Sequence, residues 1–401
     1  MKKLVLVLIL ISVLFLASCA TQPAQPSDGA ASASPSSAPS ESGAPSESGE
    51  PVGEFPDDDN PPVNPDDTQS PSGETPTTEP FPAEIFFAGL WEHTQAFDET
   101  FTLTVAGMEL SGLEIDYLGL LPSLTSCEYS ATEADGAVTA EFTVTYAPGY
   151  KLAAAYLNEP LILKLSDREL QTYGQAVSVL GEVILPDMTD YEKELAIHDY
   201  IVDNCVYDLD NLAAGTVSDD MREPYGVLVR KVAICSGYST TFKMFMDMLG
   251  IECDIISGIG NGAEYGGDHA WNRVKLGDDY YLVDVTWDDP VGTNNDGRAV
   301  SHTYFNVTDE VMARDHTPDK PYSPSAFATE FNYFYYNKLV IGSQAEFDAA
   351  VAAAHEKGLP EVTLLCVGVN AAELDREAVF SYVKSFSYSI DDSVNTITII
   401  F

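Results

Sequence analysis

The chain has 401 residues, enough for two or three domains, and its 63 acidic residues against 19 basic ones give a formal net charge of −44. A chain this acidic is repelled by phosphate groups. This argues against nucleic acid as a partner and against electrostatic docking on anionic lipid.

A targeting segment opens the chain. Two lysines precede an apolar run from Leu4 to Ala17, which is too short to span a bilayer and is typical of a signal peptide. The run ends in Leu-Ala-Ser-Cys19, which resembles the lipobox of bacterial lipoproteins and implies cleavage before Cys19 with lipid on its sulfur. We therefore expect residues 1–19 to place the protein at the bacterial cell surface, lipid-anchored to the outer face of the cytoplasmic membrane. The alternative is an ordinary signal peptide cut nearby.

Two further regions precede the central part of the chain. Residues 20–82 consist mainly of Ser, Pro, Gly, Glu and Asp, which predicts a disordered tether. Residues 83–162 are β-rich: Phe101–Val105 and Val138–Tyr146 alternate between apolar and polar residues, as half-buried antiparallel strands do. We interpret 83–162 as an accessory module, which either binds a ligand or gives packing support to the central region.

Residues 163–324 start with two helical patterns. The first covers Leu163–Leu185, and a capping box at Thr189–Glu192 starts a second helix that runs to about Asn204. His198 lies on the inner stripe of this second helix. We expect it to be a core residue at a helix interface.

A cysteine stands at the start of the next predicted helix. Ser236–Leu249 has an apolar face at helical spacing, and Gly250 is the expected stop signal. Cys235 therefore sits at a helix N-terminus, where unpaired backbone N–H groups and the helix dipole favour an anion such as a thiolate.

A hairpin comes next, formed by His269–Leu276 and Tyr280–Trp287 around Gly-Asp-Asp. If Leu276 pairs with Asp279, the loop holds an even number of residues and His269 pairs with Thr286. Asp284 then lies one diagonal step from His269 on the same face, within reach of an imidazole. An odd loop would place Asp284 on the opposite face.

These motifs resemble the bacterial form of the transglutaminase-like superfamily of papain-type cysteine enzymes. The likeness is carried by Val-Ala-Ile-Cys235-Ser-Gly-Tyr, His269-Ala-Trp-Asn and Asp284-Val-Thr-Trp-Asp-Asp-Pro, in that order. The resemblance implies an α+β papain/transglutaminase-like core, in which a helix bearing the cysteine packs on an antiparallel sheet bearing His and Asp. It also implies that Cys235 is the nucleophile, His269 the base and Asp284 the residue that orients the base. The Gly-Gln-Cys-Trp signature of the animal crosslinking enzymes is absent.

Further residues are candidates for the oxyanion site or the walls of the cleft. The backbone N–H of Cys235 should be the main oxyanion donor. The side-chain candidates are Tyr207, Ser236, Tyr238, Trp271 and Trp287. For Tyr207 a packing role explains the residue equally well, and the two tryptophans either wall the cleft or pack under it. His302, in Ser301–Val307, resembles a residue that supports the site from a strand closing the family's core.

No metal or other cofactor is expected from the sequence. The cysteines show no paired spacing typical of zinc, and the Asn-Asn-Asp-Gly297 turn lacks the ligand spacing of a calcium loop. With Cys19 set aside the cysteines are odd in number, so an exported chain keeps at least one thiol unpaired within the molecule.

The last region, residues 325–401, reads as a small βαβαβ domain. We expect strands at Tyr333–Ile341, Glu361–Val369 and Thr396–Phe401, separated by helices that start at Ser343 and Ala372. No residue pattern here indicates chemistry, so the domain is expected to bind substrate or partner, or to be structural.

The sequence therefore predicts a surface-anchored cysteine enzyme that hydrolyses peptide or amide bonds through a Cys-His-Asp triad. Its expected partners are a peptide or protein substrate, including cell-wall peptide, and the membrane through its lipid anchor. One alternative is a protein-crosslinking transglutaminase, since both reactions share the same first step. The other is a surface binding or adhesion protein on a catalytically degenerate scaffold of the same type.

Overall fold

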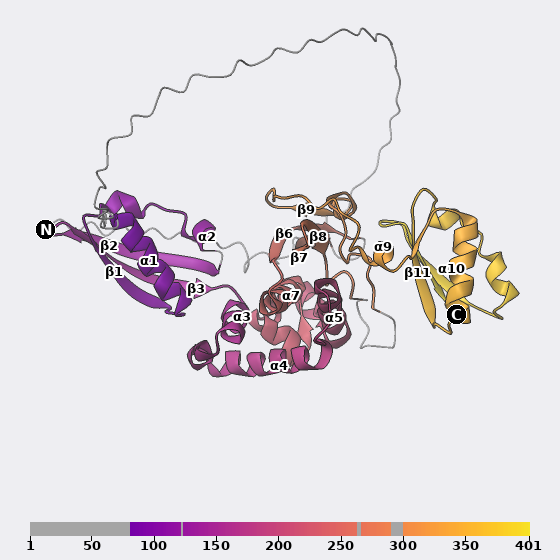
Figure 1. Cartoon of the computed structure of the whole chain (residues 1–401), viewed down its shortest axis with the longest axis horizontal. Helices are drawn as coiled ribbons and strands as arrows, with labels where there is room; N and C mark the ends of the chain where they lie inside the picture. Colours follow the sequence, from indigo (N-terminus) through magenta and orange to yellow (C-terminus); the bar gives the residue numbers. More distant parts are fainter. Residues whose placement is uncertain (1–80, 122, 263–265, 290–299) are drawn as a thin grey trace, which may run out of the picture. The chain divides into compact units, whose positions relative to one another are not determined.

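The computed structural model describes residues 81–121, 123–262, 266–289 and 300–401, which form an α+β chain (Figure 1). Cys19, the signal segment, the tether up to residue 80 and the turn at 294–297 lie outside the described residues. Within the described residues, no helix combines the length and the apolar character needed to cross a membrane.

The first described region contains a three-stranded antiparallel sheet in the order β1-β3-β2. The predicted alternation is present in β3, whose buried residues recur at every second position, and in β1, where Phe101 and Val105 are buried and Leu103 between them is partly buried. The sequence patterns gave no sign of the helix that precedes the sheet or of the second strand. The elements are α1 (Pro82–Gln95), β1 (Thr100–Ala106), α2 (Tyr117–Leu120), β2 (Leu124–Ala134) and β3 (Ala137–Tyr146).

Helices and one short strand pair make up residues 150–249, which cross the predicted boundary at residue 162 between the accessory module and the central region. As predicted, Thr189 and Glu192 form a capping box at the start of α5, and Gly250 ends α7 in the left-handed conformation with φ 74°. The elements are α3 (Tyr150–Leu157), α4 (Asp167–Val183), α5 (Asp190–Asn204), β4 (Val206–Tyr207), α6 (Leu209–Ala214), β5 (Val232–Ala233) and α7 (Cys235–Leu249). The buried face of α7 forms part of the core, with Phe242 and Phe245 fully buried.

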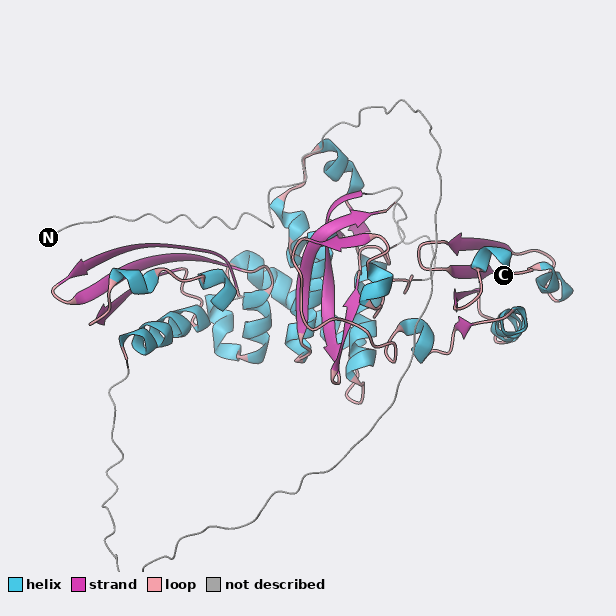
Figure 2. Cartoon of the chain, turned by 90° about the horizontal axis from the view of Figure 1, so that it is seen from above, coloured by secondary structure: helices cyan, strands magenta, loops and turns pink. Residues whose placement is uncertain are grey.

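An antiparallel sheet in the order β8-β7-β6-β9 packs against α7 through β6 and β7 (Figure 2). Its strands are β6 (Cys253–Asn261), β7 (Gly266–Leu276), β8 (Asp279–Val283) and β9 (His316–Pro318), and a short helix, α8 (Asp309–Met312), precedes β9. Leu276 pairs with Asp279, so the hairpin has the predicted even loop.

The second hairpin strand is shorter than predicted. It ends at Val283, and the expected pair of His269 with Thr286 does not form. The reason is local: the backbone N–H groups of Thr286 and Trp287 donate to the Asp284 side chain at 3.0 and 3.2 Å, which turns the chain out of the ladder. The predicted strand at Ser301–Val307 is likewise reduced to a single bridge between Leu282 and Val307.

The C-terminal region departs from the predicted βαβαβ order. Its sheet has the order β10-β11-β13-β12, with only β10 and β11 parallel. The elements are α9 (Tyr333–Tyr336), β10 (Val340–Ile341), α10 (Gln344–Glu356), β11 (Glu361–Cys366), β12 (Ser387–Asp391) and β13 (Thr396–Ile400).

Side-chain hydrogen bonds explain both errors in this region. Asn332 caps a helical turn where a strand was predicted from Tyr333. The helix predicted at Ala372–Ser385 is replaced by two 3₁₀ turns, because the backbone N–H of Asp375 donates to Gln344 on α10 at 2.8 Å and its carboxylate caps Glu377.

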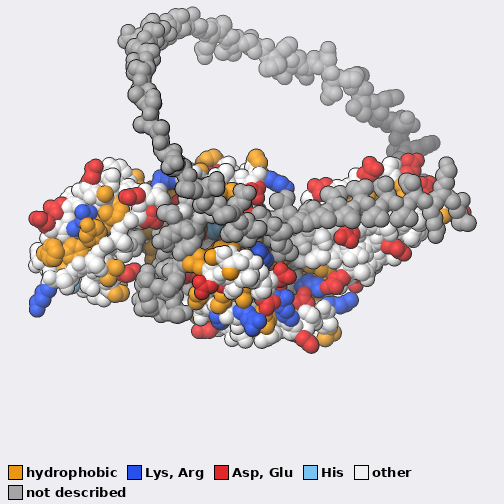
Figure 3. Space-filling view, turned by 180° about the vertical axis from the view of Figure 1, so that it is seen from behind, with side chains coloured by type: hydrophobic (Ala, Val, Ile, Leu, Met, Phe, Trp, Pro, Cys, Tyr) orange, Lys and Arg blue, Asp and Glu red, His pale blue; other side chains and the backbone are white. Residues whose placement is uncertain are grey.

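The surface agrees with the acidic composition. Acidic side chains occur on every described part of the face seen in Figure 3, whereas Lys and Arg gather in small groups. Two basic residues each pair with two acidic ones: Arg168 forms ion pairs with Asp220 and Glu223, and Lys151 with Glu99 and Glu169.

Candidate active site

Cys235 is the first residue of α7, directly after the short strand β5. Its side chain is buried, with 6% of the residue exposed. The close packing at this helix start depends on Gly237: a Cβ there would lie 2.5 Å from the Met221 carbonyl oxygen and 2.8 Å from the Ala233 Cβ. The Cys-Ser-Gly sequence therefore lets the helix N-terminus sit tightly on its neighbours while it presents the thiol.

His269 on β7 contacts both of the residues predicted to join it. Its Nε2 lies 2.6 Å from the Asp284 Oδ2, and the Cys235 side chain lies close enough to raise its pKa. Because Asp284 holds Nε2, Nδ1 is the nitrogen left to face the thiol. The structure thus brings together Cys235, His269 and Asp284, which come from a helix start, a strand and the turn after a strand.

The electrostatics of this group favour a charged imidazole. Burial lowers the pKa of His269, but the Asp284 carboxylate and the Cys235 side chain outweigh it and raise the pKa to about 10. Burial raises the pKa of Asp284. Its contacts with His269 and His316 outweigh burial and hold this pKa well below the usual range. His269 therefore stays protonated, and Asp284 ionised, through neutral pH.

His316 was not predicted from the sequence, yet it shares the Asp284 carboxylate with His269. Its Nε2 lies 3.0 Å from Asp284 Oδ2, and its Nδ1 lies 2.7 Å from the Asp315 Oδ1. Burial lowers the pKa of His316, but hydrogen bonds to these two carboxylates raise it overall. No local motif marks this histidine, because β9 reaches the site only by pairing with β6.

The two tryptophans surround these imidazoles. The Trp287 ring centre lies 5.4 Å from that of His269 and 4.3 Å from that of His316. Trp271 is almost fully buried, and its ring centre lies 6.1 Å from that of His269 and 4.9 Å from that of His316. On β6, a Cβ at Gly260 would lie 2.9 Å from the Trp287 ring and 3.3 Å from the His269 ring, so this strand needs glycine beneath the site.

The remaining cleft candidates differ in position. Ser236 follows the cysteine, and its buried Oγ has no hydrogen-bond partner. Tyr207 is half-buried, with its ring 6.2 Å from that of Tyr238. Tyr238 is a correction: it is fully buried and its hydroxyl donates to Asp289, so it ties α7 to the turn after Asp284 and does not line a cleft.

Two histidines considered from the sequence lie in a different cluster. His198 is fully buried, as expected of a core residue, and hydrogen-bonds Asp199 and Asp288. His302 was expected to support the triad, but it bonds Asp199 and stacks on Tyr333 with ring centres 3.8 Å apart. Its position is set by the loop before Val307, which does not form the predicted strand.

This arrangement can perform nucleophilic chemistry. An imidazolium, a thiol at a helix N-terminus and a carboxylate that fixes the imidazole are the components of activated cysteine nucleophiles. Two groups of side chains in the described structure have a geometry that could hold a metal ion. One is His198, Asp199 and His302, and the other is His269, Asp284 and His316. All three residues of the latter group are buried, and both histidines already bond the Asp284 carboxylate.

Comparisons with known proteins agree with the sequence motifs. Residues 178–285 match the profile of the transglutaminase-like superfamily. The kyphoscoliosis peptidase of Homo sapiens is 28% identical over 196 residues, covering 43% of this chain and 29% of that protein. The chain thus spans less than a third of the length of that curated relative.

Two solved structures show weaker likeness. A structure described as a TGase has 18% identity and a TM-score of 0.25, covering 52% of this chain and 59% of that one. A candidate cysteine protease from Cytophaga hutchinsonii has 13% identity and a TM-score of 0.25, covering 47% and 65%. Both scores are low, so the assignment rests on the sequence matches and on the motifs at Cys235, His269 and Asp284. On these grounds the chain carries a transglutaminase-like domain.

Proposed function

We propose that the protein is a cysteine acyl-transfer enzyme that hydrolyses peptide or amide bonds, with Cys235, His269 and Asp284 as its catalytic triad. The observation that carries the proposal is the position of His269, whose Nε2 lies 2.6 Å from the Asp284 carboxylate and whose pKa the neighbouring Cys235 side chain helps to raise. A lone cysteine or histidine would carry no such inference.

The reaction follows from these contacts. The Cys235 thiolate attacks the amide carbon, the C–S bond forms, and the carbonyl oxygen becomes an oxyanion. The protonated His269 gives its Nδ1 proton to the leaving nitrogen as the C–N bond breaks, and the amine departs. The neutral imidazole then takes a proton from water, whose oxygen attacks the thioester and releases the acid and Cys235. Asp284 keeps the other ring proton on Nε2 throughout.

The oxyanion needs donors at the helix start. The first N–H groups of an α-helix have no acceptor within the helix, so the backbone N–H of Cys235 is the main candidate. The buried Oγ of Ser236, which has no partner, is a second donor available beside it. Tyr207, Trp271 and Trp287 remain candidates for shaping the cleft.

Hydrolysis is favoured over crosslinking by the residues that come after the nucleophile. A crosslinking enzyme must hold an amine against the acyl-enzyme while it excludes water, and only differential stabilisation of the transition state achieves this. Small residues, Ser236 and Gly237, stand where the animal crosslinking enzymes carry a tryptophan. The human relative is named a peptidase, which supports the same choice.

Labelling with iodoacetamide tests the nucleophile without knowledge of the substrate. At neutral pH, one equivalent of reagent should modify Cys235 ahead of the other described thiols. Burial raises the pKa of Cys127 to about 11, that of Cys205 to about 12, and those of Cys253 and Cys366 in the same direction. Peptide mapping by mass spectrometry measures the order of reaction.

The control for this labelling is the variant His269→Gln, in which the reactivity of Cys235 should fall to that of an ordinary buried thiol. Faster modification of Cys205 or Cys253 in the folded protein would contradict the assignment. Equal inertness of the five thiols within the described residues would favour the alternative, a binding protein on a degenerate scaffold.

The same proposal places the enzyme at the bacterial cell surface, where its substrates would include proteins and cell-wall peptides. It is supported by the apolar run that ends in Leu-Ala-Ser-Cys19. In a bacterial host, the variant Cys19→Ser should move the protein from the membrane fraction to the soluble fraction, because it removes the sulfur that carries the lipid. Retention of Cys19→Ser in the membrane fraction would mean that another anchor exists.

A further inference from the structure

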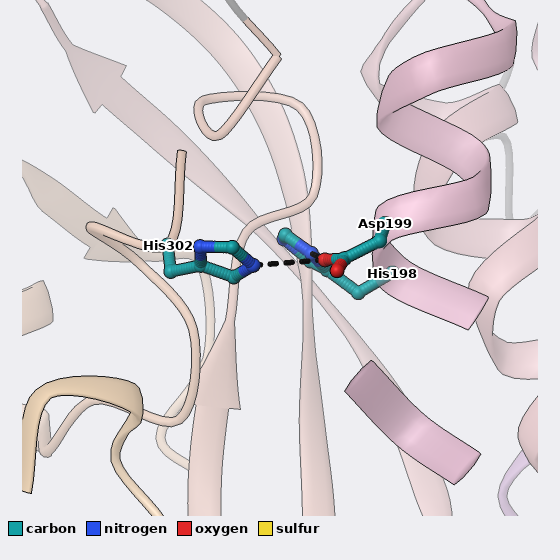
Figure 4. Close-up of side chains that lie close together, drawn as sticks. All are labelled: His198, Asp199 and His302. Carbon is teal, nitrogen blue, oxygen red and sulfur yellow. Dashed lines mark hydrogen bonds and ion pairs between the residues drawn. The ribbon is translucent and has the colours of Figure 1, made fainter. Parts of the chain in front are cut away.

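A second cluster of chemically active side chains lies away from the proposed triad, between α5 and the loop that contains His302. Asp199 Oδ1 lies 3.0 Å from Nδ1 of His198 and 2.8 Å from Nε2 of His302. Figure 4 shows the two side chains Asp199 and His302 directed toward one another, with His198 beside them. The three donor atoms all lie within 4.8 Å of one another.

We propose that His198, Asp199 and His302 form a binding site for a divalent transition-metal ion, tested here as Zn²⁺. Two imidazole nitrogens and one carboxylate oxygen suit this class of ion, whereas Ca²⁺ and Mg²⁺ prefer sites made of oxygen alone. With zinc bonds of about 2.0–2.2 Å, the donors of a tetrahedral ion lie about 3.3–3.6 Å apart. Asp199 Oδ1 is less than 1 Å closer than this to each of the two imidazole nitrogens, so small side-chain movements open the site.

A second carboxylate fixes the orientation of His198. Its other ring nitrogen, Nε2, lies 3.1 Å from Oδ2 of Asp288, and both side chains are fully buried. Asp288 is held in turn, because its Oδ1 accepts hydrogen bonds from the Ser301 hydroxyl and the Tyr304 backbone N–H, each at 3.0 Å. Metal-binding histidines almost always donate their free N–H to such a partner, which sets the tautomer and the ring orientation.

Tyr333 holds His302 in place, and two of the three proposed ligands are reached by solvent. The His302 ring stacks on Tyr333 with an interplanar angle of 5°, so its Nε2 stays aimed at Asp199. The side chain of Asp199 is 36% exposed and that of His302 10% exposed, which provides the path by which an ion enters. Asp203, one turn further along α5, interacts electrostatically with all three residues and adds negative potential there.

Binding would connect segments that the sequence keeps far apart. His198 and Asp199 belong to α5, His302 to the loop before Val307, and Asp288 to the turn that begins at Asp284. The backbone N–H of Asp288 donates to the Asp284 carbonyl oxygen at 3.2 Å. The ion would therefore stabilise the turn that presents Asp284, although metal binding itself does not depend on the proposed reaction.

The experiment uses the full chain with Cys235→Ala, because a thiolate beside His269 could bind zinc independently. The protein is treated with a chelator, supplied with ZnCl₂ and passed over a desalting column, and the zinc retained is measured by mass spectrometry. We expect about one zinc per chain and a higher Tm with zinc than without, since an ion that binds only the folded state stabilises it.

Variants on this background locate the ion. His302→Gln and Asp199→Asn should each lose the retained zinc and the rise in Tm. Asp288→Asn should weaken zinc binding by about 10- to 100-fold while leaving all three ligands in place, an effect that a purely structural role would not produce. His316→Gln is the matched control, because it disrupts the other histidine–carboxylate cluster, and it should keep the zinc.

Three results would overturn the proposal. The first is failure of the Cys235→Ala protein to retain zinc, which would make the cluster an internal ion pair only. The second is zinc retention in both ligand variants, His302→Gln and Asp199→Asn, at the level of the Cys235→Ala parent. The third is loss of zinc in His316→Gln with retention in His302→Gln, which would place the ion at His269, Asp284 and His316.

Discussion

Replacing Cys235 with alanine should abolish amide hydrolysis, with a fall in kcat of at least about 10³-fold. Alanine cannot form the thioester, and neither His269 nor a bound water can replace the sulfur as nucleophile in the same geometry. The change removes one atom from a buried helix start, so the fold should remain. The matched control is Cys366→Ala, because Cys366 is a buried thiol on β11 and should leave activity unchanged.

The assay can separate hydrolysis from crosslinking at the same time. Casein peptides and cell-wall stem peptides are incubated with a labelled primary amine in water enriched in ¹⁸O, and products are identified by mass spectrometry. We expect ¹⁸O in new carboxyl groups and little incorporation of the amine. Efficient amine incorporation that disappears in Cys235→Ala would show a transferase instead. Turnover that survives Cys235→Ala would remove Cys235 as the nucleophile.

Replacing Asp284 with asparagine should lower kcat by about 10²- to 10⁴-fold, with a much smaller effect on KM. In the present structure Asp284 Oδ1 accepts the backbone N–H groups of Thr286 and Trp287, while Oδ2 faces His269 and His316. An asparagine that keeps its oxygen on the backbone donors must turn its NH₂ toward His269.

That orientation produces the wrong tautomer. An NH₂ group donates to Nε2, so the neutral His269 carries its proton on Nδ1, the nitrogen that faces Cys235, and cannot accept the thiol proton. Flipping the amide would restore an acceptor for His269, but it would place the NH₂ against two backbone N–H donors. The first orientation thus loses the acceptor that orients His269, and the second loses the hydrogen bonds from Thr286 and Trp287 that hold the side chain in place.

The pH dependence of kcat tests the role of the Asp284 carboxylate independently. Asp284 helps to raise the pKa of His269 to about 10, so activity that requires the imidazolium should persist to alkaline pH and decline near that value. Without the carboxylate charge, the pKa should fall toward the ordinary histidine value of about 6.5. The alkaline limb of the kcat profile of Asp284→Asn should therefore move to lower pH.

Two further variants check this interpretation. Asp279→Asn makes the same chemical change at the exposed turn of the same hairpin and should leave both kcat and the pH profile unchanged. His316→Gln keeps the bond between His269 and Asp284, so its effect should be smaller than that of Asp284→Asn. An Asp284→Asn enzyme with an unshifted alkaline limb would contradict the proposed role of the carboxylate.

Much of the site could be predicted from short stretches of sequence. The capping box at Thr189, the stop at Gly250 and the turn between Leu276 and Asp279 are each determined by neighbouring residues, whose backbone preferences and side-chain hydrogen bonds act locally. The helix start therefore positions Cys235, and the hairpin register brings His269 and Asp284 to one face.

The wrong secondary-structure predictions also came from the local preferences of short segments. Tyr333–Ile341 has the composition of a strand and Ala372–Ser385 that of a helix, but Asn332 and Gln344 form hydrogen bonds that end or replace those elements. The strand predicted through Trp287 stops at Val283 because the Asp284 side chain takes two backbone donors from the ladder. In each case a side-chain contact outweighed the propensity of the segment.

The sequence by itself determined the helix start that carries Cys235, the strand that carries His269 and the hairpin register, although the strand predicted to carry Asp284 ends one residue before it. Only the tertiary structure decided what surrounds them. His316 reaches Asp284 because β9 joins the sheet beside β6, and His302 reaches Asp199 because its loop folds back onto α5. Such contacts depend on strand order and helix packing, which are fixed by burial of the whole core and leave no periodic signal near the residues themselves.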